Sequence, residues 1–161
     1  MQTETSLAWN KHICYRGIIN ERSEDAPFIG ALIIAANCSN RCKNCFNQHL
    51  KAAKLYCKDV ESIIAEVKQN VFNEGIILGG LEWSEQPDEA IALIRCAIEN
   101  NLKVILYTGL TEPELFKRIP PTHLYGCYVK FGKYDCNKAV TNYTSFGVAL
   151  ASSNQYINFI Q

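Results

Sequence analysis

Residues 28–45 read FIGALIIAANCSNRCKNC, an apolar run that leads directly into three closely spaced cysteines. The run from Phe28 to Ala36 is short and continuous, which is typical of a strand buried on both faces of a sheet. Cys38, Cys42 and Cys45 follow it in C-x3-C-x2-C spacing. The stretch therefore predicts a buried strand that leads into a cysteine loop at the end of a sheet.

Strand and helix patterns alternate on both sides of this stretch. Val60, Ile63, Ile64 and Val67 recur at helical spacing behind Asp59, a residue type that caps helix N-termini. Apolar runs and turn residues predict strands at 12–20, 28–36, 75–80, 102–107, 125–131 and 146–151, the first of them pairing at a sheet edge. Further helices are predicted after Pro87, with Ile91, Ile94 and Ile98 on the apolar face and Leu93 and Ala97 beside it, and after Thr111, which forms a capping-box pattern with Glu114.

This order predicts an α/β fold with a mostly parallel sheet and right-handed crossovers. An eight-fold barrel takes about 250 residues, more than this chain offers. We therefore expect residues 1–161 to form a single-domain partial (open) β/α barrel. Sites in parallel α/β folds lie beyond the carboxyl ends of the strands. The cysteine loop, the pair Gly79–Gly80 and the pair Thr108–Gly109 are all expected at that rim.

Composition argues for a cytoplasmic globular protein. Lysine plus arginine number 16 and aspartate plus glutamate number 16, so no basic footprint for nucleic acid or a membrane surface is present. No apolar run approaches the roughly 18 residues of a membrane-spanning helix. The opening MQTETSLAWN also lacks the basic and apolar regions of a signal peptide.

The cysteine loop has two chemical interpretations. Three thiolates can hold three irons of a [4Fe-4S] cubane and leave the fourth iron open to a chelating small molecule. Alternatively, His49 lies four residues after Cys45 and could complete a structural Cys3His zinc site. A structural zinc normally organises its own small module, whereas this loop follows a buried strand of an α/β chain. The context favours iron and sulfur, and ordinary loop cysteines remain a third possibility.

The other five of the eight cysteines are scattered along the chain. Because cytosolic thiols stay reduced, Cys14, Cys57 and Cys96 are expected to be buried apolar thiols. Cys127 and Cys136 could ligate a second metal, but no third ligand lies close to them in sequence.

A glycine pair followed by an acidic residue is the second candidate binding element. Gly79 and Gly80 end a predicted strand and would let a ligand approach the backbone closely. Glu82, just beyond them, could accept a hydrogen bond from a ligand ammonium group. A simple strand-to-loop turn explains the glycines equally well.

Four stretches together resemble a known family. They are Cys38–Asn47 with its three cysteines and Phe46, Leu78–Gly80, Tyr107–Gly109, and Ala151–Gln155. The cysteine spacing resembles the cluster motif of the radical S-adenosylmethionine superfamily. Within it, the chain is most similar to the small activating proteins of anaerobic ribonucleoside-triphosphate reductase. The resemblance covers most of the chain from Phe28 to about Ile157, and that family's fold is an open α/β partial barrel.

The resemblance implies both cofactors and partners. Cys38, Cys42 and Cys45 would hold a [4Fe-4S] cluster, and S-adenosyl-L-methionine would chelate its open iron. Reductive cleavage would yield a 5′-deoxyadenosyl radical that takes hydrogen from a backbone glycine of anaerobic ribonucleotide reductase. A flavodoxin-like protein would donate the electron. The residues implied as lining the cofactor are Asn44, Phe46, Gly79, Gly80, Glu82, Ser153 and Asn154, while the chemistry itself is carried by the cluster and S-adenosylmethionine rather than by a catalytic side chain.

The chain also departs from the family pattern. Asn44 stands where the superfamily often has an aromatic residue, and Glu82 lies one place later than the usual acidic residue, which leaves its contact with the cofactor open. Lys130, Lys133 and Tyr134 could contact the partner or the cofactor carboxylate. Two alternatives stay open: a radical enzyme acting on a small molecule, such as a deazapurine synthase, and a non-catalytic zinc or iron-sulfur binding module.

Overall fold

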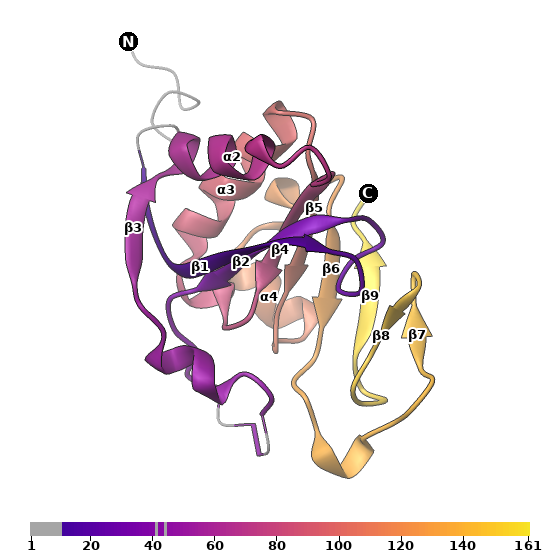
Figure 1. Cartoon of the computed structure of the whole chain (residues 1–161). Coiled ribbons are helices and arrows are strands. Elements are labelled where there is room, and N and C mark those ends of the chain that lie inside the picture. Colours follow the sequence, from indigo (N-terminus) through magenta and orange to yellow (C-terminus); the bar gives the residue numbers. More distant parts are fainter. Residues whose placement is uncertain (1–10, 41, 44) are drawn as a thin grey trace.

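The structure is a computed structural model that describes residues 11–40, 42–43 and 45–161. Its centre is a seven-stranded sheet in the order β3-β1-β2-β4-β5-β6-β9 (Figure 1). The strands are β1 (His12–Arg22), β2 (Gly30–Ala35), β3 (Tyr56–Asp59), β4 (Gly75–Gly79), β5 (Lys103–Tyr107), β6 (Tyr128–Phe131) and β9 (Tyr156–Phe159). The helices are α2 (Val60–Gln69), α3 (Pro87–Glu99) and α4 (Glu112–Arg118).

The sheet is mixed. Strands β2, β4, β5 and β6 pair in parallel, as the alternation of strands and helices predicts. The flanking pairs β1–β2, β1–β3 and β6–β9 are antiparallel. Strands β3 and β9 form the two edges of the sheet, so within the described residues it does not close. The α/β class is confirmed, whereas the expected barrel is not.

Both faces of the central strands are buried, and alternate residues serve different cores. Ile76 and Leu78 of β4 belong to the larger core, which contains the apolar faces of α2, α3 and α4. Ile77 points the other way and packs with Val148, Leu150 and Ile157. This alternation is the pleat of a strand with a hydrophobic layer on each side. It explains why the strand reads as an unbroken apolar run.

The predicted helix after Asp59 is confirmed as α2, and its buried residues are Val60, Ile63, Ile64 and Val67. Asp59 caps it by accepting a hydrogen bond from the Ser62 backbone nitrogen at 2.8 Å. The predicted start of α3 at Pro87 and the Thr111–Glu114 capping box of α4 are also confirmed.

Several expectations need correction. Ile98 was expected on the buried face of α3 but is 44% exposed, because the helix buries Ala90, Ala92 and Cys96 together with the expected Leu93, Ile94 and Ala97. Strand β1 is not an edge, since β3 pairs outside it. The expected strand at 146–151 shrinks to β8 (Val148–Ala149), which pairs only with β7 (Thr144–Ser145) in a separate small sheet.

None of the helices in the described residues combines the length and apolar character needed to cross a membrane.

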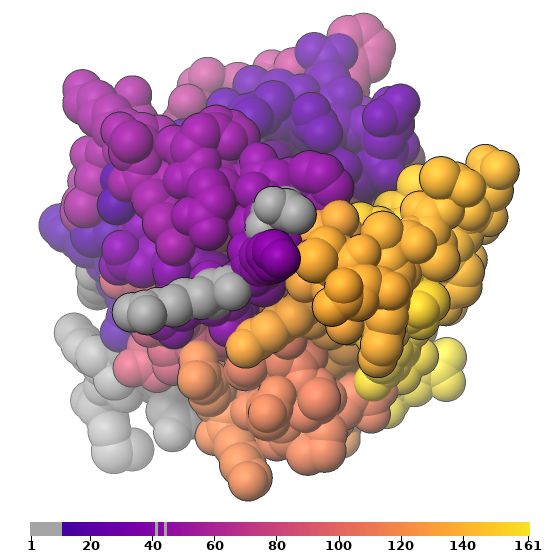
Figure 2. Space-filling model, turned by 90° about the horizontal axis from the view of Figure 1, so that it is seen from below, coloured from indigo at the N-terminus to yellow at the C-terminus, as the bar shows by residue number. Residues whose placement is uncertain are grey.

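The loop after β2 and the segment after β6 both extend beyond the same end of the sheet in Figure 1. Seen from below, they lie against each other (Figure 2). This end carries the carboxyl ends of the parallel strands, where α/β folds place their sites.

Candidate functional site

A cavity of about 160 Å³ lies at this end of the sheet. Its walls combine the cysteine loop with residues that follow β4, β5 and β6. The expected convergence on one rim is therefore seen for the cysteine loop, Gly80 and Thr108–Gly109, but Gly79 does not line the cavity. The lining residues used below are Cys38, Asn40, Cys42, Cys45, Phe46, Asn47, Gly80, Glu82, Tyr107, Thr108, Gly109, Lys130, Lys133, Tyr134, Ala151 and Gln155.

The three loop cysteines are free thiols, each partly buried. A tight turn holds the last two, because the Cys45 backbone nitrogen donates to the Cys42 carbonyl oxygen at 3.2 Å. The Asn47 backbone nitrogen in turn donates to Cys45 Sγ at 3.4 Å. Burial is the main cause that raises the pKa of the Cys38 and Cys42 thiols. Three sulfurs on one cavity, one with a backbone donor, are a donor set that fits an iron-sulfur cluster.

A single metal ion fits this site less well. Among the described residues, no three His, Cys, Asp or Glu side chains are grouped closely enough to hold one ion. In a cubane each thiolate binds a different iron, so its cysteines need not converge on one point. His49 also lines a different, neighbouring cavity of about 230 Å³, which shares Asn47, Gly80 and Tyr107 with the first. The Cys3His zinc interpretation therefore gains no support from the geometry.

Glu82 organises the rim. The residue is 3% exposed, and its carboxylate accepts four hydrogen bonds, three of them from other parts of the rim. Oε1 accepts from the Gly109 backbone nitrogen at 2.6 Å, from Thr108 Oγ1 at 3.2 Å and from Asn40 Nδ2 at 3.2 Å. Oε2 accepts from the Ser84 backbone nitrogen at 3.1 Å. The carboxylate thus joins the cysteine loop to the end of β5, and Glu82 positions the loop.

Gly79, the last residue of β4, and Gly80, which follows it, differ. Gly80 has φ +77°, and a Cβ there would lie 2.9 Å from Ile34 Cγ2. A Cβ on Gly79 would make ordinary contacts of 3.4 Å or more, and Gly79 is not among the lining residues. The Gly80 position therefore requires glycine for the turn itself, independent of any ligand.

Lys130 contributes a cation to the cavity. Its Nζ lies 4.7 Å from the centre of the Tyr107 ring. No ion pair with a carboxylate involves Lys130 within the part of the chain that the structure describes. Burial lowers the pKa of the Lys130 ammonium to about 8, and the nearby charges of Asp25 and Glu82 counteract that effect only partly. A desolvated ammonium without a carboxylate partner favours an anionic ligand.

The remaining predicted residues are distributed unevenly. Phe46 lines the cavity, is 67% exposed, and packs against Tyr134 with ring centres 4.9 Å apart. Asn44 lies outside the described residues. Ser153 and Asn154 are not among the lining residues, and Asn154 Nδ2 instead donates to the Lys133 carbonyl oxygen at 2.7 Å.

Sequence reasoning missed Gln155, Asn40 and Asn47. Gln155 is 3% exposed, and its Oε1 accepts from the Ala151 and Ser152 backbone nitrogens at 3.1 and 3.2 Å. Its Nε2 donates to the Gly132 carbonyl oxygen at 3.2 Å, which ties the segment before β9 to the end of β6. Since Gln155 closes the fourth stretch of the resemblance, that stretch indicated the right loop but not the right residue.

The cysteines outside the loop correct another expectation. Cys14 and Cys57 form a disulfide, and neither is buried: Cys57 is exposed and Cys14 is partly buried. The expectation was wrong because edge strand β3, which carries Cys57, has no apolar pattern that reveals its pairing with β1. Cys96 and Cys127 are buried free thiols, and burial raises their pKa to about 11 and about 12. Cys136 is a partly buried free thiol.

Three thiols beside a cavity at the carboxyl ends of the parallel strands of an α/β fold fit the class of iron-sulfur proteins. Comparison with family models agrees, because residues 29–157 match the 4Fe-4S single cluster domain. The chain belongs to that family, and its cofactor is an iron-sulfur cluster. A search of curated proteins gives no match.

Proposed function

We propose that this protein is a radical S-adenosylmethionine enzyme in which Cys38, Cys42 and Cys45 hold three irons of a [4Fe-4S] cluster. The observation that carries the proposal is that the described lining of the cavity contains three cysteines and no histidine. Three protein ligands leave one iron open. When bound, the cluster supplies the electron for reductive cleavage of S-adenosylmethionine to methionine and a 5′-deoxyadenosyl radical.

The chain's own residues bind and orient that cofactor. The Lys130 ammonium is the group available to pair with the methionyl carboxylate, since no carboxylate of the described protein pairs with it. Both carboxylate oxygens of Glu82 accept hydrogen bonds from the protein, and the donors are Gly109, Thr108, Asn40 and Ser84. Glu82 therefore fixes the rim rather than holding the methionyl ammonium. Tyr107 and Phe46 supply apolar wall to exclude water.

We further infer that the substrate is a backbone glycine of anaerobic ribonucleotide reductase, with a flavodoxin-like electron donor. Support comes from the four stretches that resemble the activating proteins of that reductase. Each contributes to the one cavity: Cys38–Asn47 through its cysteines, Leu78–Gly80 through Gly80, Tyr107–Gly109 throughout, and Ala151–Gln155 through its two ends. Residues 1–161 would act as a single radical domain.

The test uses Cys38→Ala with Cys136→Ala as the matched control, both reconstituted with iron and sulfide under anaerobic conditions. We expect wild type and Cys136→Ala to bind about four irons per chain and to release 5′-deoxyadenosine from S-adenosylmethionine after reduction. Cys38→Ala should lose both properties. Full cleavage activity in Cys38→Ala would overturn the ligand assignment.

The partner is tested separately. The reduced, reconstituted protein is mixed with S-adenosylmethionine and the glycyl-radical subunit of an anaerobic ribonucleotide reductase. A glycyl radical detected by electron paramagnetic resonance is the expected result. Cleavage of S-adenosylmethionine without that radical would point to a small-molecule substrate, and one zinc with no iron would point to a non-catalytic binding module.

A further inference from the structure

The disulfide lies at an accessible edge of the sheet. Cys14 of β1 and Cys57 of β3 are directly opposite each other in the antiparallel register, and their sulfurs are bonded. Cys57 is exposed, and Cys14 is partly buried. In the part of the chain that the structure describes, the four-residue strand β3 pairs with β1 alone. A thiol in solution can therefore reach the Cys57 sulfur without unfolding the core.

The bond also encloses the cysteine loop. Cys14 and Cys57 are 43 residues apart in sequence, and Cys38, Cys42 and Cys45 lie between them. The loop leaves the sheet after β2 and returns to it through β3. Fastening β3 to β1 therefore fixes the point where the loop returns to the sheet.

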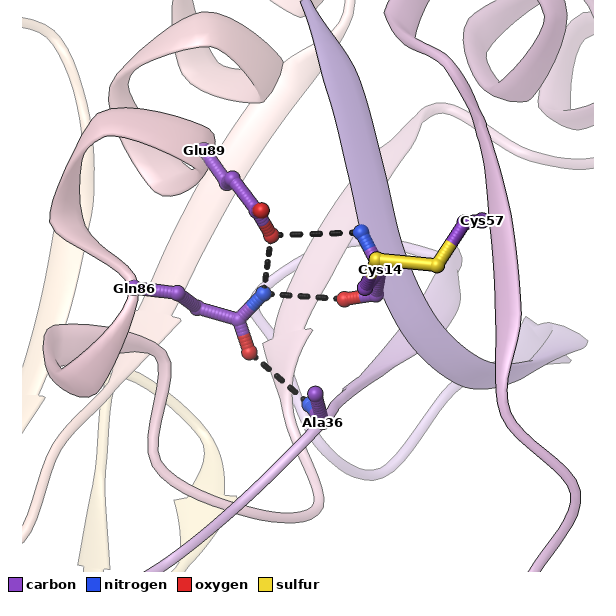
Figure 3. Close-up of a disulfide and its surroundings, with 5 residues drawn as sticks. All are labelled: Cys14, Ala36, Cys57, Gln86 and Glu89. Atoms are coloured by element: carbon purple, nitrogen blue, oxygen red, sulfur yellow. Dashed lines mark hydrogen bonds between the residues drawn. A yellow bond between two sulfur atoms is a disulfide. The ribbon is translucent and has the colours of Figure 1, made fainter.

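Hydrogen bonds connect the disulfide to the start of the loop. Gln86, just before α3, donates through Nε2 to the Cys14 carbonyl oxygen at 2.8 Å and accepts through Oε1 from the Ala36 backbone nitrogen at 2.8 Å (Figure 3). Glu89 accepts from the Cys14 backbone nitrogen at 3.2 Å and from Gln86 Nε2 (Figure 3). The Gln86 side chain thus forms hydrogen bonds with the backbone of Cys14 and with the backbone of Ala36, the first residue of the loop.

Arg16, two residues beyond Cys14, holds both ends of the loop. Its Nε donates to the Ala36 carbonyl oxygen at 2.6 Å, and its Nη1 donates to the Ala53 carbonyl oxygen at 2.5 Å. Movement of β3 relative to β1 would disturb the contact with Ala53, which lies three residues before β3. Gln86 therefore acts on the start of the loop, the disulfide on the end that returns through β3, and Arg16 on both ends.

We propose that Cys14 and Cys57 form a thiol–disulfide switch, opened by a dithiol reductant, that sets how tightly the described residues of the loop between β2 and β3 (36–40, 42–43 and 45–55) are held. A thiolate of the dithiol attacks Cys57 Sγ and releases Cys14 as a thiolate, which takes a proton. The second thiolate of the dithiol then attacks the dithiol sulfur that is bonded to Cys57 and releases Cys57 as a thiolate, which also takes a proton. The reagent leaves as a cyclic disulfide. Two electrons and two protons pass from the dithiol to the protein. A disulfide oxidant reverses the reaction.

The first experiment measures the switch itself. The full chain with its reconstituted cluster is equilibrated, without oxygen, in mixtures of reduced and oxidised dithiothreitol, then alkylated and analysed by peptide mass spectrometry. We expect the Cys14–Cys57 link to be present in the oxidised mixtures and to be lost along a two-electron curve as the reduced share rises. A link that persists in fully reduced dithiothreitol until denaturant is added would show a purely structural crosslink and overturn the proposal.

The second experiment measures the loop. Trypsin cleaves after Lys51 and Lys54, both exposed near the end of the loop. Cleavage there should be on the order of tenfold faster when the disulfide is open. Reduced wild type and the Cys14→Ser/Cys57→Ser variant should both show it, and oxidised Cys136→Ser should not. Equal rates in oxidised and reduced wild type would contradict the proposal, even if the variant were misfolded.

Neither readout depends on S-adenosylmethionine. Iron content is measured on the same samples, so a failure to assemble the cluster is recorded separately from a failure of the switch. The proposal concerns the loop that carries the proposed cluster ligands, but it would stand if the enzyme acted on a different substrate.

Discussion

Glu82 connects four donors of the rim through one buried carboxylate, so its charge is its main contribution. We predict that Glu82→Gln lowers the free energy of unfolding by about 1–3 kcal/mol, because hydrogen bonds to a charged acceptor are the stronger kind and an amide leaves one donor facing another. Urea denaturation at neutral pH measures the change. Exposed Glu99→Gln is the control, with an expected effect within about 0.5 kcal/mol. Equal loss in both variants would contradict the positioning role.

In the proposed S-adenosylmethionine site, Lys130 makes cofactor binding depend on pH. Its pKa of about 8 means that the ammonium is present below that pH and is lost as the pH rises through it. We predict that the ratio of S-adenosylmethionine affinities, wild type over Lys130→Arg, is constant below about pH 8 and falls above it, since arginine stays charged. Taking the ratio cancels the titration of the ligand. Equilibrium binding from pH 6.5 to 9.5 measures it, and a flat ratio would remove Lys130 from the carboxylate site.

At this scale the sequence reveals residues with a distinctive spacing and conceals those whose role depends on packing. The cysteines and Glu82 were predicted by position in the chain, and the structure brings them to one cavity. Gln155 has no local signal, because its hydrogen bonds go to the Ala151–Ser152 turn and to Gly132 on another element. Likewise, nothing in the sequence around Lys130 shows that it has no carboxylate partner among the described residues.

The turn after β4 gives an element-scale prediction. Gly80→Ala should destabilise the protein by about 1–3 kcal/mol, because φ is +77° and the new methyl would collide with Ile34 of β2. Gly79→Ala, one residue earlier, should cost less than about 1 kcal/mol, since its methyl meets only ordinary contacts. Thermal unfolding of both variants decides the matter. If Gly79→Ala were the more damaging of the two, this description of the turn would be wrong.

Elements with strong periodicity were predictable, and edge elements were not. Helix α2 matches its predicted buried face because four apolar residues at helical spacing leave one orientation. Strands β3 and β9 carry mostly exposed side chains, so neither shows the apolar pattern that identified β4 and β5. Ile98 was misassigned because α3 also buries small residues such as Ala90 and Ala92, which a pattern of large apolar residues does not reveal.

At the scale of the whole molecule, the parallel centre of the sheet follows from the strand–helix alternation, but its closure does not. The antiparallel strands β1, β3 and β9 add to both sides of that centre and depend on contacts distant in sequence. The position of the site was still predictable. Every parallel strand ends at the same rim. The loops after β2, β4, β5 and β6 therefore meet there, independently of how the edge strands pair.

The central claim is that three cysteine thiolates leave one iron of the cluster open to S-adenosylmethionine. The most direct measurement is electron–nuclear double resonance on the reduced, reconstituted protein with S-adenosylmethionine labelled with nitrogen-15 on its amino group. We predict a nitrogen-15 coupling to the cluster in wild type and in His49→Ala alike. A cluster that shows no such coupling in wild type, together with a histidine nitrogen signal that His49→Ala abolishes, would contradict it.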